Sequence, residues 1–449
     1  PLMAQDLGIQ QSLMNIAVSI TALFSGIFIV VMGGLADRIG RVRIVQWGFL
    51  FSIAGSLLVA LAPTGAMGST FLMLGRICQG LSGAFIMPAS LALVKEYWDG
   101  AARQRAVSLW SMGSWGGSGF AALFGGLMAQ NLGWRSIFFA GAAISVIGLL
   151  MVRGTPESRA ETKAGYKFDL GGVITFMITM VALQIFATQG ASFGWGSWQT
   201  PGLLATAIVF GVIFFRIESG NSNAFVNFGL FRNMTYTGAT ISNFLLNGVA
   251  GILIVSMTLL QLGGDMDAQQ TGLLTLGYAI AIVAFIRVGE KLLQRFGPRK
   301  PMIWGSLIVG VSILLLMQSH MMLGTYKILA VFAYTLFGLG LAFYATPSTD
   351  AALSNLPSDQ AGSGSGIYKM ASSLGASFGV AISAAIFTAL SGDNSAVNWI
   401  EGVISYVGRQ DNLAVREAAF FALGINLLMV VAAIVSIMVT VPKGNPHDK

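Results

Sequence analysis

The sequence contains little charge, one cysteine and two histidines. Lys, Arg, Asp and Glu together make up 10% of its 449 residues. The single cysteine, Cys78, excludes a disulfide framework and a cysteine-based metal site, and His320 and His447 are too few for a histidine cluster. No Gly-Lys dipeptide occurs, which excludes the phosphate-binding loop of ATP-driven proteins. We therefore expect no cofactor, and any work must be driven by a gradient or run downhill.

Apolar residues dominate the composition. They make up 55% of the chain, which excludes ordinary water-soluble packing. The net charge of +7 could indicate a nucleic-acid partner, but that class gathers its charge on a basic patch. Here the basic residues occupy short loops between apolar runs. We therefore expect a lipid bilayer as the partner, and no nucleic acid.

The apolar runs predict an all-α integral membrane protein. A helix needs about 20 residues to cross ~30 Å of hydrocarbon, and thirteen apolar runs are near or above this length. The predicted spans are 13–35, 44–62, 70–95, 105–130, 136–152, 170–190, 201–215, 234–261, 270–288, 301–319, 328–352, 365–391 and 418–441.

Positive charge predicts the orientation of these spans. Alternate loops are rich in Lys and Arg, whereas the loops between them hold only Arg135, Lys327, Arg409 and Arg416. The positive-inside rule places the rich loops and the C-terminus in the cytoplasm, and Pro1 outside. The simplest explanation for that start is an absent first helix, with fourteen spans in the intact protein. A true external tail over residues 1–11 is the alternative.

An internal repeat relates the two ends of the chain. Residues 37–40 correspond to 294–297, and Pro88 corresponds to Pro347, at separations of 257 to 259 residues. Two homologous halves around a midplane site are typical of secondary transporters. We predict an N-terminal bundle over 1–152, a linker with two extra membrane helices over 153–233, and a C-terminal bundle over 234–449.

The loop after the first predicted span is the most specific feature. Its sequence from Gly33 to Arg43 resembles the G-x-L-a-D-r-x-G-r loop of the major facilitator superfamily. The resemblance implies two six-helix bundles, here with two inserted helices, and it implies a charged gate in this loop. The residues that would form the gate are Gly33, Asp37, Arg38, Gly40 and Arg41, together with Glu96 or Asp99 at the end of the third span. A turn that only sets topology is the alternative.

Few charges lie inside the predicted spans. Arg76, in a segment that resembles the R-x-x-q-G motif of the superfamily, would lower the pKa of a nearby acid or polarise a water molecule, unless it snorkels outward. Asp350 and Lys369 lie near the ends of adjacent spans and could pair, and Glu290 ends another span. We assign proton coupling to these four residues, with a structural ion pair as the alternative for the acids.

The span 105–130 carries glycine or alanine at every fourth residue, at Gly113, Gly117, Ala121 and Gly125. Such ladders allow helices to pack closely. The segment that continues to Gly126 resembles the antiporter motif g-x-x-x-G-P-x-x-G-G, but Ala121-Ala122 replaces Gly-Pro and leaves a helix bend unguaranteed. A hinge is as compatible with this pattern as tight packing.

Polar and aromatic residues could line a central cavity. Asn243 and Asn247 share one helix face, and Trp110, Trp115 and Tyr344 could add aromatic walls. The 21 methionines provide adaptable apolar surface that suits varied ligands. Packing between helices or against lipid is the alternative for each residue.

Longer strings narrow the resemblance. Residues 20–26, 110–117, 153–158, 236–244 and 366–371 look like the fourteen-helix drug:proton antiporters, of the NorB/NorC type of staphylococcal efflux pump. This resemblance implies a monomer in the bacterial cell membrane that exports amphipathic or cationic antimicrobials, such as quinolones and dyes, in exchange for protons. A coupled transporter of one metabolite and a transport-inactive receptor or scaffold are the alternatives. No nucleophile–base–orienter set indicates an enzyme, and the glycine ladders disfavour a channel.

The predicted repeat can be tested through topology. In a Cys78→Ser background, Arg43→Cys and Lys300→Cys should both react with a membrane-impermeant thiol reagent from the cytoplasmic side, because both loops are positive. Arg409→Cys should react from the outside. Labelling of the first two positions from opposite sides would contradict the repeat.

Overall fold

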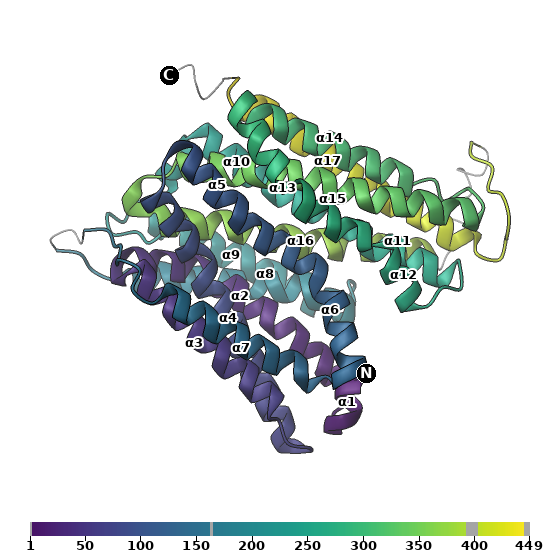
Figure 1. The fold of residues 1–449 in the computed structure, drawn as a ribbon, viewed down its shortest axis with the longest axis horizontal. Helices are drawn as coiled ribbons and strands as arrows, with labels where there is room; N and C mark the ends of the chain where they lie inside the picture. Colours follow the sequence, from purple (N-terminus) through teal and green to yellow (C-terminus); the bar gives the residue numbers. More distant parts are fainter. Residues whose placement is uncertain (1, 162–164, 392–402, 444–449) are drawn as a thin grey trace. The chain divides into compact units, whose positions relative to one another are not determined.

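Every described element of the chain is a helix. The computed structural model describes residues 2–161, 165–391 and 403–443 (Figure 1). The helices of the first part are α1 (Leu2–Leu7), α2 (Gln11–Ile39), α3 (Arg41–Ala60), α4 (Ala66–Tyr97), α5 (Gly100–Ser111), the π-helical turn η1 (Met112–Gly116), α6 (Gly117–Leu132), α7 (Arg135–Val152), α8 (Leu170–Phe193) and α9 (Gln199–Ser219).

The remaining helices follow the short 3₁₀ turn η2 (Phe228–Arg232). They are α10 (Met234–Gly248), α11 (Gly251–Leu262), α12 (Ala268–Leu274), α13 (Leu276–Phe296), α14 (Arg299–Leu316), α15 (Leu323–Ser354), the 3₁₀ turn η3 (Ser358–Gln360), α16 (Ala361–Ser391) and α17 (Leu413–Thr440). The prediction of an all-α chain is confirmed.

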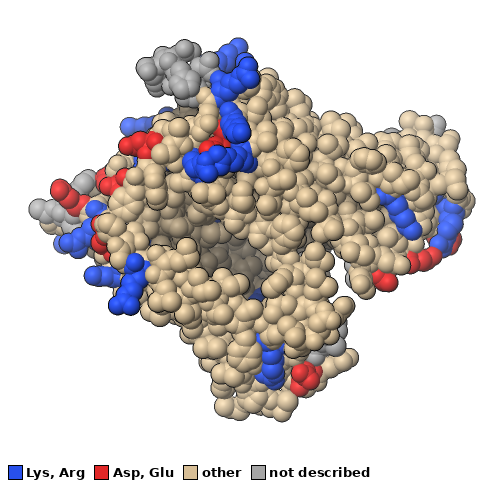
Figure 2. All heavy atoms as spheres, in the orientation of Figure 1, with Lys and Arg blue, Asp and Glu red and all other residues tan. Residues whose placement is uncertain are grey.

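Twelve helical stretches of the described residues are long and apolar enough to cross a membrane. The remaining predicted span, 105–130, is α5, η1 and α6, which follow one another without a break. Large apolar side chains stay exposed along several of these helices, as at Ile144, Leu150 and Met151 of α7. Much of the surface in Figure 2 carries no charge, and the charged side chains form separate groups. An apolar surface of this kind fits contact with lipid.

The chain forms two compact units that are not continuous in sequence. The first comprises 1–99, 122–233 and 353–370, and the second comprises 100–121, 234–352 and 371–449. Helix α16 therefore begins in the first unit and ends in the second. The domain boundaries drawn from the repeat, after residues 152 and 233, stay a prediction.

Each unit has its own apolar core. In the first unit, Ala36 of α2, Ile44 of α3 and Phe85 of α4 belong to one buried cluster. In the second unit, a larger cluster includes Tyr334 of α15 and Leu423 of α17. The tyrosine is tolerated there because its hydroxyl lies 2.5 Å from the Ser256 hydroxyl, which satisfies both polar groups.

Glycines allow α16 to approach α10 in the second unit. A Cβ atom added at Gly375 would collide with the Phe244 carbonyl, and one at Gly379 would collide with the backbone of Gly248. These two glycines, four residues apart on one face of α16, therefore form the contact with α10. Close approach of this kind substitutes backbone packing for large side chains.

The corresponding ladder in the span 105–130 behaves differently. A Cβ atom added at Gly113, Gly117 or Gly126 would meet no described atom within 4 Å, and one at Gly125 would only touch Ile137 at 3.9 Å. These four glycines therefore show no close approach to another described element, and the assignment of the ladder, with Ala121, to helix packing stays a prediction.

The π-helical turn η1 explains the difference. An α-helix returns to the same face after 3.6 residues, but a π turn is wider, so the residues that follow it face another direction. The close approaches in this span occur instead at Gly116, against Val283, and at Gly119, against Ala279. The span therefore carries a backbone irregularity, η1, before the position where the motif would place its proline.

Two alanine substitutions separate the two kinds of glycine. Gly379→Ala should destabilise the purified protein by about 1–3 kcal/mol, because the new methyl group meets backbone that cannot move aside. Gly126→Ala, where the space is open, should leave stability unchanged or raise it by up to ~1 kcal/mol. Thermal unfolding of the two variants beside the unmodified protein measures both effects. Equal behaviour of the two would contradict the packing described here.

Candidate functional site

The carboxylate of Asp37 binds the beginning of α16. Asp37 lies in the last turn of α2 and is 4% exposed. Its Oδ1 accepts a hydrogen bond from the Gly362 amide at 2.7 Å, and its Oδ2 accepts one from the Ser363 amide at 2.9 Å. Amides in the first turn of a helix have no partner within the helix, and the helix dipole makes that end attractive to anions. Asp37 therefore supplies both hydrogen-bond acceptors and negative charge to α16.

Arg41, the first residue of α3, holds this carboxylate in place. Its Nε and Nη2 donate to Asp37 Oδ1 at 3.1 and 2.9 Å, and its side chain is 1% exposed. An arginine buried so completely needs partners for each of its N–H groups. Together with Gly362 and Ser363, it brings the hydrogen bonds that Asp37 accepts to four.

The rest of the guanidinium binds groups from other segments. Nη2 donates to the Ser358 carbonyl at 2.6 Å, Nη1 donates to the Ser158 hydroxyl at 2.9 Å, and Glu96 lies 3.6 Å from Nη1. We call this group the latch, defined as Asp37, Arg41, Glu96, Ser158, Ser358, Gly362 and Ser363. The latch brings together Asp37, Arg41 and Glu96 as the sequence predicted.

The two glycines predicted for the gate, Gly33 and Gly40, are each required by the local structure, for different reasons. Gly40 joins α2 to α3 with a φ of 137°, a backbone conformation that favours glycine. A Cβ atom on it would lie 2.6 Å from the Glu157 carboxylate. Gly33 lies against α16, where an added Cβ atom would collide with the Gly362 carbonyl. Both positions therefore require the absence of a side chain.

Glu157 is a residue whose part in the site the sequence did not reveal. Its Oε1 accepts from the Val42 amide at 2.9 Å, and its Oε2 accepts from the Arg43 amide at 3.1 Å. The loop after α7 thus returns to cap the helix that begins with Arg41. The string Arg153-Gly154-Thr155-Pro156-Glu157-Ser158 was the available signal, but nothing in it says which helix end it meets.

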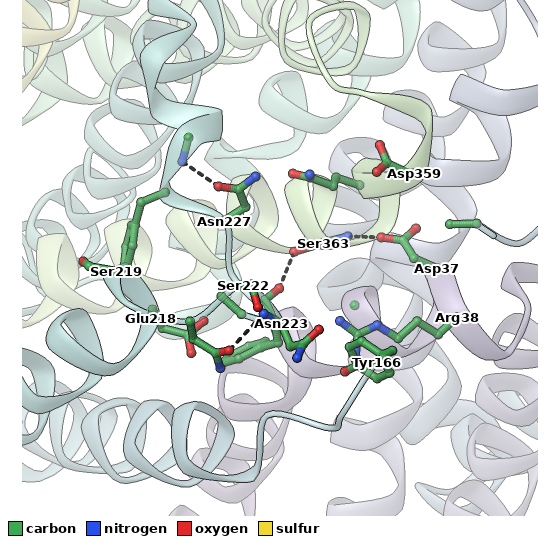
Figure 3. A pocket seen from close by; sticks show the side chains of 18 of the residues that line it. Asp37, Arg38, Tyr166, Glu218, Ser219, Ser222, Asn223, Asn227, Asp359 and Ser363 are labelled. Atoms are coloured by element: carbon green, nitrogen blue, oxygen red, sulfur yellow. Dashed lines mark hydrogen bonds between the residues drawn. The ribbon is translucent and has the colours of Figure 1, made fainter. Parts of the chain in front are cut away.

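Arg38 lies beside the latch, on a polar cavity of about 700 Å³ (Figure 3). Its guanidinium stacks over the Tyr166 ring, 3.8 Å from the ring centre. The walls come from the end of α2, the loops after α7 and α9, and the first turn of α16. The polar lining residues include Asp37, Arg38, Tyr166, Glu218, Asn221, Asn223, Asn227, Arg232, Asp359 and Ser363.

Arg76 lies in α4, within a predicted span, and is half-buried. Its Nη1 donates to the Gln79 Oε1 at 2.8 Å, and its Nε donates to the Ala17 carbonyl at 3.3 Å. These bonds hold the guanidinium inside unit one without an ion pair to a described residue. Its predicted part in proton coupling stays a prediction.

Asp350, near the end of α15, is 4% exposed and forms an ion pair. Its Oδ1 accepts from the Arg103 Nε at 2.8 Å, and Gln104 lies 3.5 Å from its Oδ2. The sequence did not identify Arg103 as a partner. Pairing of Asp350 with Lys369, which lies in α16 and is half-buried, stays a prediction.

Glu290, in α13, is 3% exposed, and its interactions are weak. Its Oε1 accepts from Gln294 at 3.4 Å, while its Oε2 lies 3.9 Å from the Arg287 guanidinium and has no hydrogen bond among the described residues. This buried carboxylate therefore has few donors around it among the described residues. The predicted role in proton coupling is compatible with this geometry but stays a prediction.

The predicted cavity residues divide into two groups. Asn247 donates to the Asn243 Oδ1 at 2.8 Å, which confirms the shared face, and Asn243 donates to Ser372 at 2.6 Å. Tyr344 is fully buried, with its hydroxyl 2.6 Å from that of Ser242, so it is a core residue rather than a lining residue.

Of the tryptophans, Trp110 is half-buried in α5, and Trp115 packs against the core of unit two. The described residues contain no cluster of three or more histidine, cysteine, aspartate or glutamate side chains that could hold a metal ion.

The sequence matches a known protein family and known proteins. Residues 1–260 and 237–445 match the family described as the Major Facilitator Superfamily. The chain is 42% identical to the Quinolone resistance protein NorB of Staphylococcus aureus (strain MRSA252), over 99% of this chain and 91% of that protein. It is 43% identical to the protein of that name from strain bovine RF122 / ET3-1, over 96% and 88% of the two chains.

Two solved structures share the fold. The proton:xylose symporter XylE has a TM-score of 0.64 at 16% identity, covering 98% of this chain and 90% of that one. The human organic anion transporter MFSD10 (TETRAN) also has a TM-score of 0.64, at 12% identity, covering 96% and 87%. Both likenesses concern the fold alone.

Neutralising Asp37 tests the latch. In Asp37→Asn, hydrogen exchange at the Gly362 and Ser363 amides should accelerate by roughly a hundredfold, equivalent to the ~3 kcal/mol lost when a buried charged pair loses one partner. Asp359→Asn is the matched control, because Asp359 is an exposed acid in the turn that precedes α16. Equal exchange in both variants would show that Asp37 does not hold the helix.

Proposed function

Because the chain belongs to the Major Facilitator Superfamily, and is therefore a multi-pass membrane transporter rather than an enzyme, we propose that it is a proton-driven multidrug exporter. The observation that carries the proposal is the 42% identity, over nearly the whole chain, to proteins named Quinolone resistance protein NorB. Its cargo would be amphipathic or cationic antimicrobials. The protein would act as a monomer in the bacterial cell membrane.

The latch would act as the switch of an alternating-access cycle. Two conformations exchange, and each ligand shifts the balance toward the one it binds better. With the latch formed, Asp37 and Arg41 hold the first turn of α16. Release would expose two amides and a buried arginine at once, so intermediate positions would be costly and the change would occur in one step.

The energy source would be a proton gradient, without a nucleotide or another cofactor. A proton carrier must be an acid whose charge is tolerated in one state and costly in the other. Asp350, paired with Arg103, and Glu290, with few donors, are the candidate carriers in the second unit. Arg76 and Lys369 would provide fixed or displaced positive charge inside the bundle.

Orientation and cargo recognition complete the proposal. The arginine-rich end with the latch would face the cytoplasm, as would the C-terminus. Asn243 and Asn247 would offer amide groups to cargo, while half-buried aromatic residues such as Trp110 would offer apolar surface. Methionine side chains in the site would let it accept drugs of different shape.

Everted membrane vesicles test the coupling. Addition of a quinolone or a cationic dye to vesicles that contain the protein and hold a proton gradient should cause proton efflux and drug uptake. A protonophore should abolish both. Asp37→Asn should reduce uptake at least tenfold, because the switch loses its charge, whereas Asp359→Asn should transport normally.

Two results would contradict the proposal. Drug uptake that ignores the pH gradient would remove the proton coupling. Absence of drug uptake, together with uptake of a single metabolite, would favour the alternative of a dedicated metabolite transporter.

A further inference from the structure

Two carboxyl groups meet at the wall of the cavity beside the latch. Asp169 precedes α8, Glu218 lies in the last turn of α9, and they are 6% and 3% exposed. Their side chains lie close enough to form a hydrogen bond when one of them carries a proton. A Cβ atom added at Gly172 would collide with both groups, which places their oxygens around one small space. Glu218 belongs to the polar lining seen in Figure 3.

This arrangement favours one shared proton. Glu218 Oε1 is buried and finds no donor among the described residues, and the carboxyl group of Asp169 lies beside it. Two ionised carboxylates are both acceptors and cannot form a hydrogen bond with each other. Two neighbouring negative charges also repel each other, and the repulsion is larger because both side chains are buried.

The helix ends decide which group keeps the proton. Asp169 caps α8, where its Oδ1 accepts from the Gly172 amide at 3.0 Å, and the positive end of the helix dipole favours an anion there. Burial raises the pKa of Asp169, but hydrogen bonds from Glu218 and the Gly172 and Phe225 amides hold it below its usual range. Glu218 lies at the negative end of α9, where an anion is disfavoured. Glu218 is therefore the donor.

Charges around the pair do not replace the proton. Arg38, on α2, interacts electrostatically with Asp169, but its guanidinium lies over Tyr166. The other titratable or charged groups that line the cavity are Asp37, Glu161, Arg232 and Asp359. None of these groups forms an ion pair with Glu218 or Asp169 among the described residues.

The pair is connected to the latch through one short segment. Glu218 Oε2 accepts from the Val226 amide at 3.0 Å, and Asp169 Oδ2 accepts from the Phe225 amide at 3.4 Å. The Phe225 carbonyl in turn accepts from the Ser363 hydroxyl at 3.1 Å. The Ser363 amide is one of the two that Asp37 binds. The carboxyl pair and Asp37 thus hold the same turn of α16 from two sides.

We propose that Asp169 and Glu218 form a proton-binding site that holds one shared proton, and that its occupancy sets how firmly the 220–227 segment grips the first turn of α16. Loss of the proton places two anions together, separates α8 from the end of α9 and releases Phe225 from Ser363. Helices α8 and α9 have no counterparts in the predicted internal repeat. This site would give them a role in binding a proton. The inference concerns proton binding and does not depend on drug export.

Infrared spectroscopy of the purified full chain tests the proton. The carbonyl stretch of a protonated carboxyl group should persist at neutral pH in the unmodified protein and be missing from Glu218→Gln. Glu161→Gln is the matched control, because Glu161 is an exposed acid on the same cavity, and its spectrum should match that of the unmodified protein.

Hydrogen exchange of residues 220–227 and 361–365 tests the link to α16. As the pH rises, exchange in the unmodified protein should accelerate relative to Glu218→Gln at the same pH, by about tenfold per pH unit once the shared proton is lost. Glu218→Gln and Asp169→Asn cannot become doubly negative and should stay protected, whereas Glu161→Gln should follow the unmodified protein. Identical infrared spectra for Glu218→Gln and the unmodified protein, or identical pH dependence of exchange, would overturn the proposal.

Discussion

The structure depends on one buried carboxylate placed at the start of a helix. Asp37 gives α16 the acceptors that its first turn lacks, and Arg41 holds that carboxylate in position. Hydrogen bonds to charged groups contribute about 1.5–3 kcal/mol each, more than neutral ones. They join segments more than 300 residues apart in the chain. The loops around Glu157 and Phe225 support the same turn, so several distant segments converge on it.

The side chains of this site could be predicted, but the backbone groups that they bind could not. Asp37, Arg41, Gly33 and Gly40 stand in a motif whose residue types are required by charge, close approach and a positive φ. Their main partner is a pair of backbone amides, at Gly362 and Ser363. Backbone amides carry no sequence signature, since every residue except proline has one. The fold was predictable for a different reason: runs of about 20 apolar residues have almost no alternative to a membrane helix.

Sequence reasoning was incomplete where packing decides the contacts of a residue. Tyr344 is an aromatic residue of the kind that often lines binding sites. It is nevertheless fully buried, and its hydroxyl bonds to that of Ser242, so it belongs to the core. Asp350 was predicted to be functional from its position alone, and the structure adds a partner, Arg103, from a helix 247 residues away in sequence. The periodicity of 105–130 did not reveal the close approaches at Gly116 and Gly119, because it assumes an uninterrupted α-helix. In each case the missing information is three-dimensional.

The wide turn η1 has a consequence for how this chain tolerates change in length. A turn that already holds one residue more than an α turn can lose that residue and remain helical. Removal of a single residue between Met112 and Gly116 would therefore convert the stretch to a regular α-helix, and the residues beyond it would keep roughly the direction that they face now. Gly119 would stay near its neighbour Ala279. The same deletion in a regular α-helical stretch would instead turn everything beyond it by about 100° about the axis. The five residues of η1 are therefore the place where this span could lose one residue and keep its contacts.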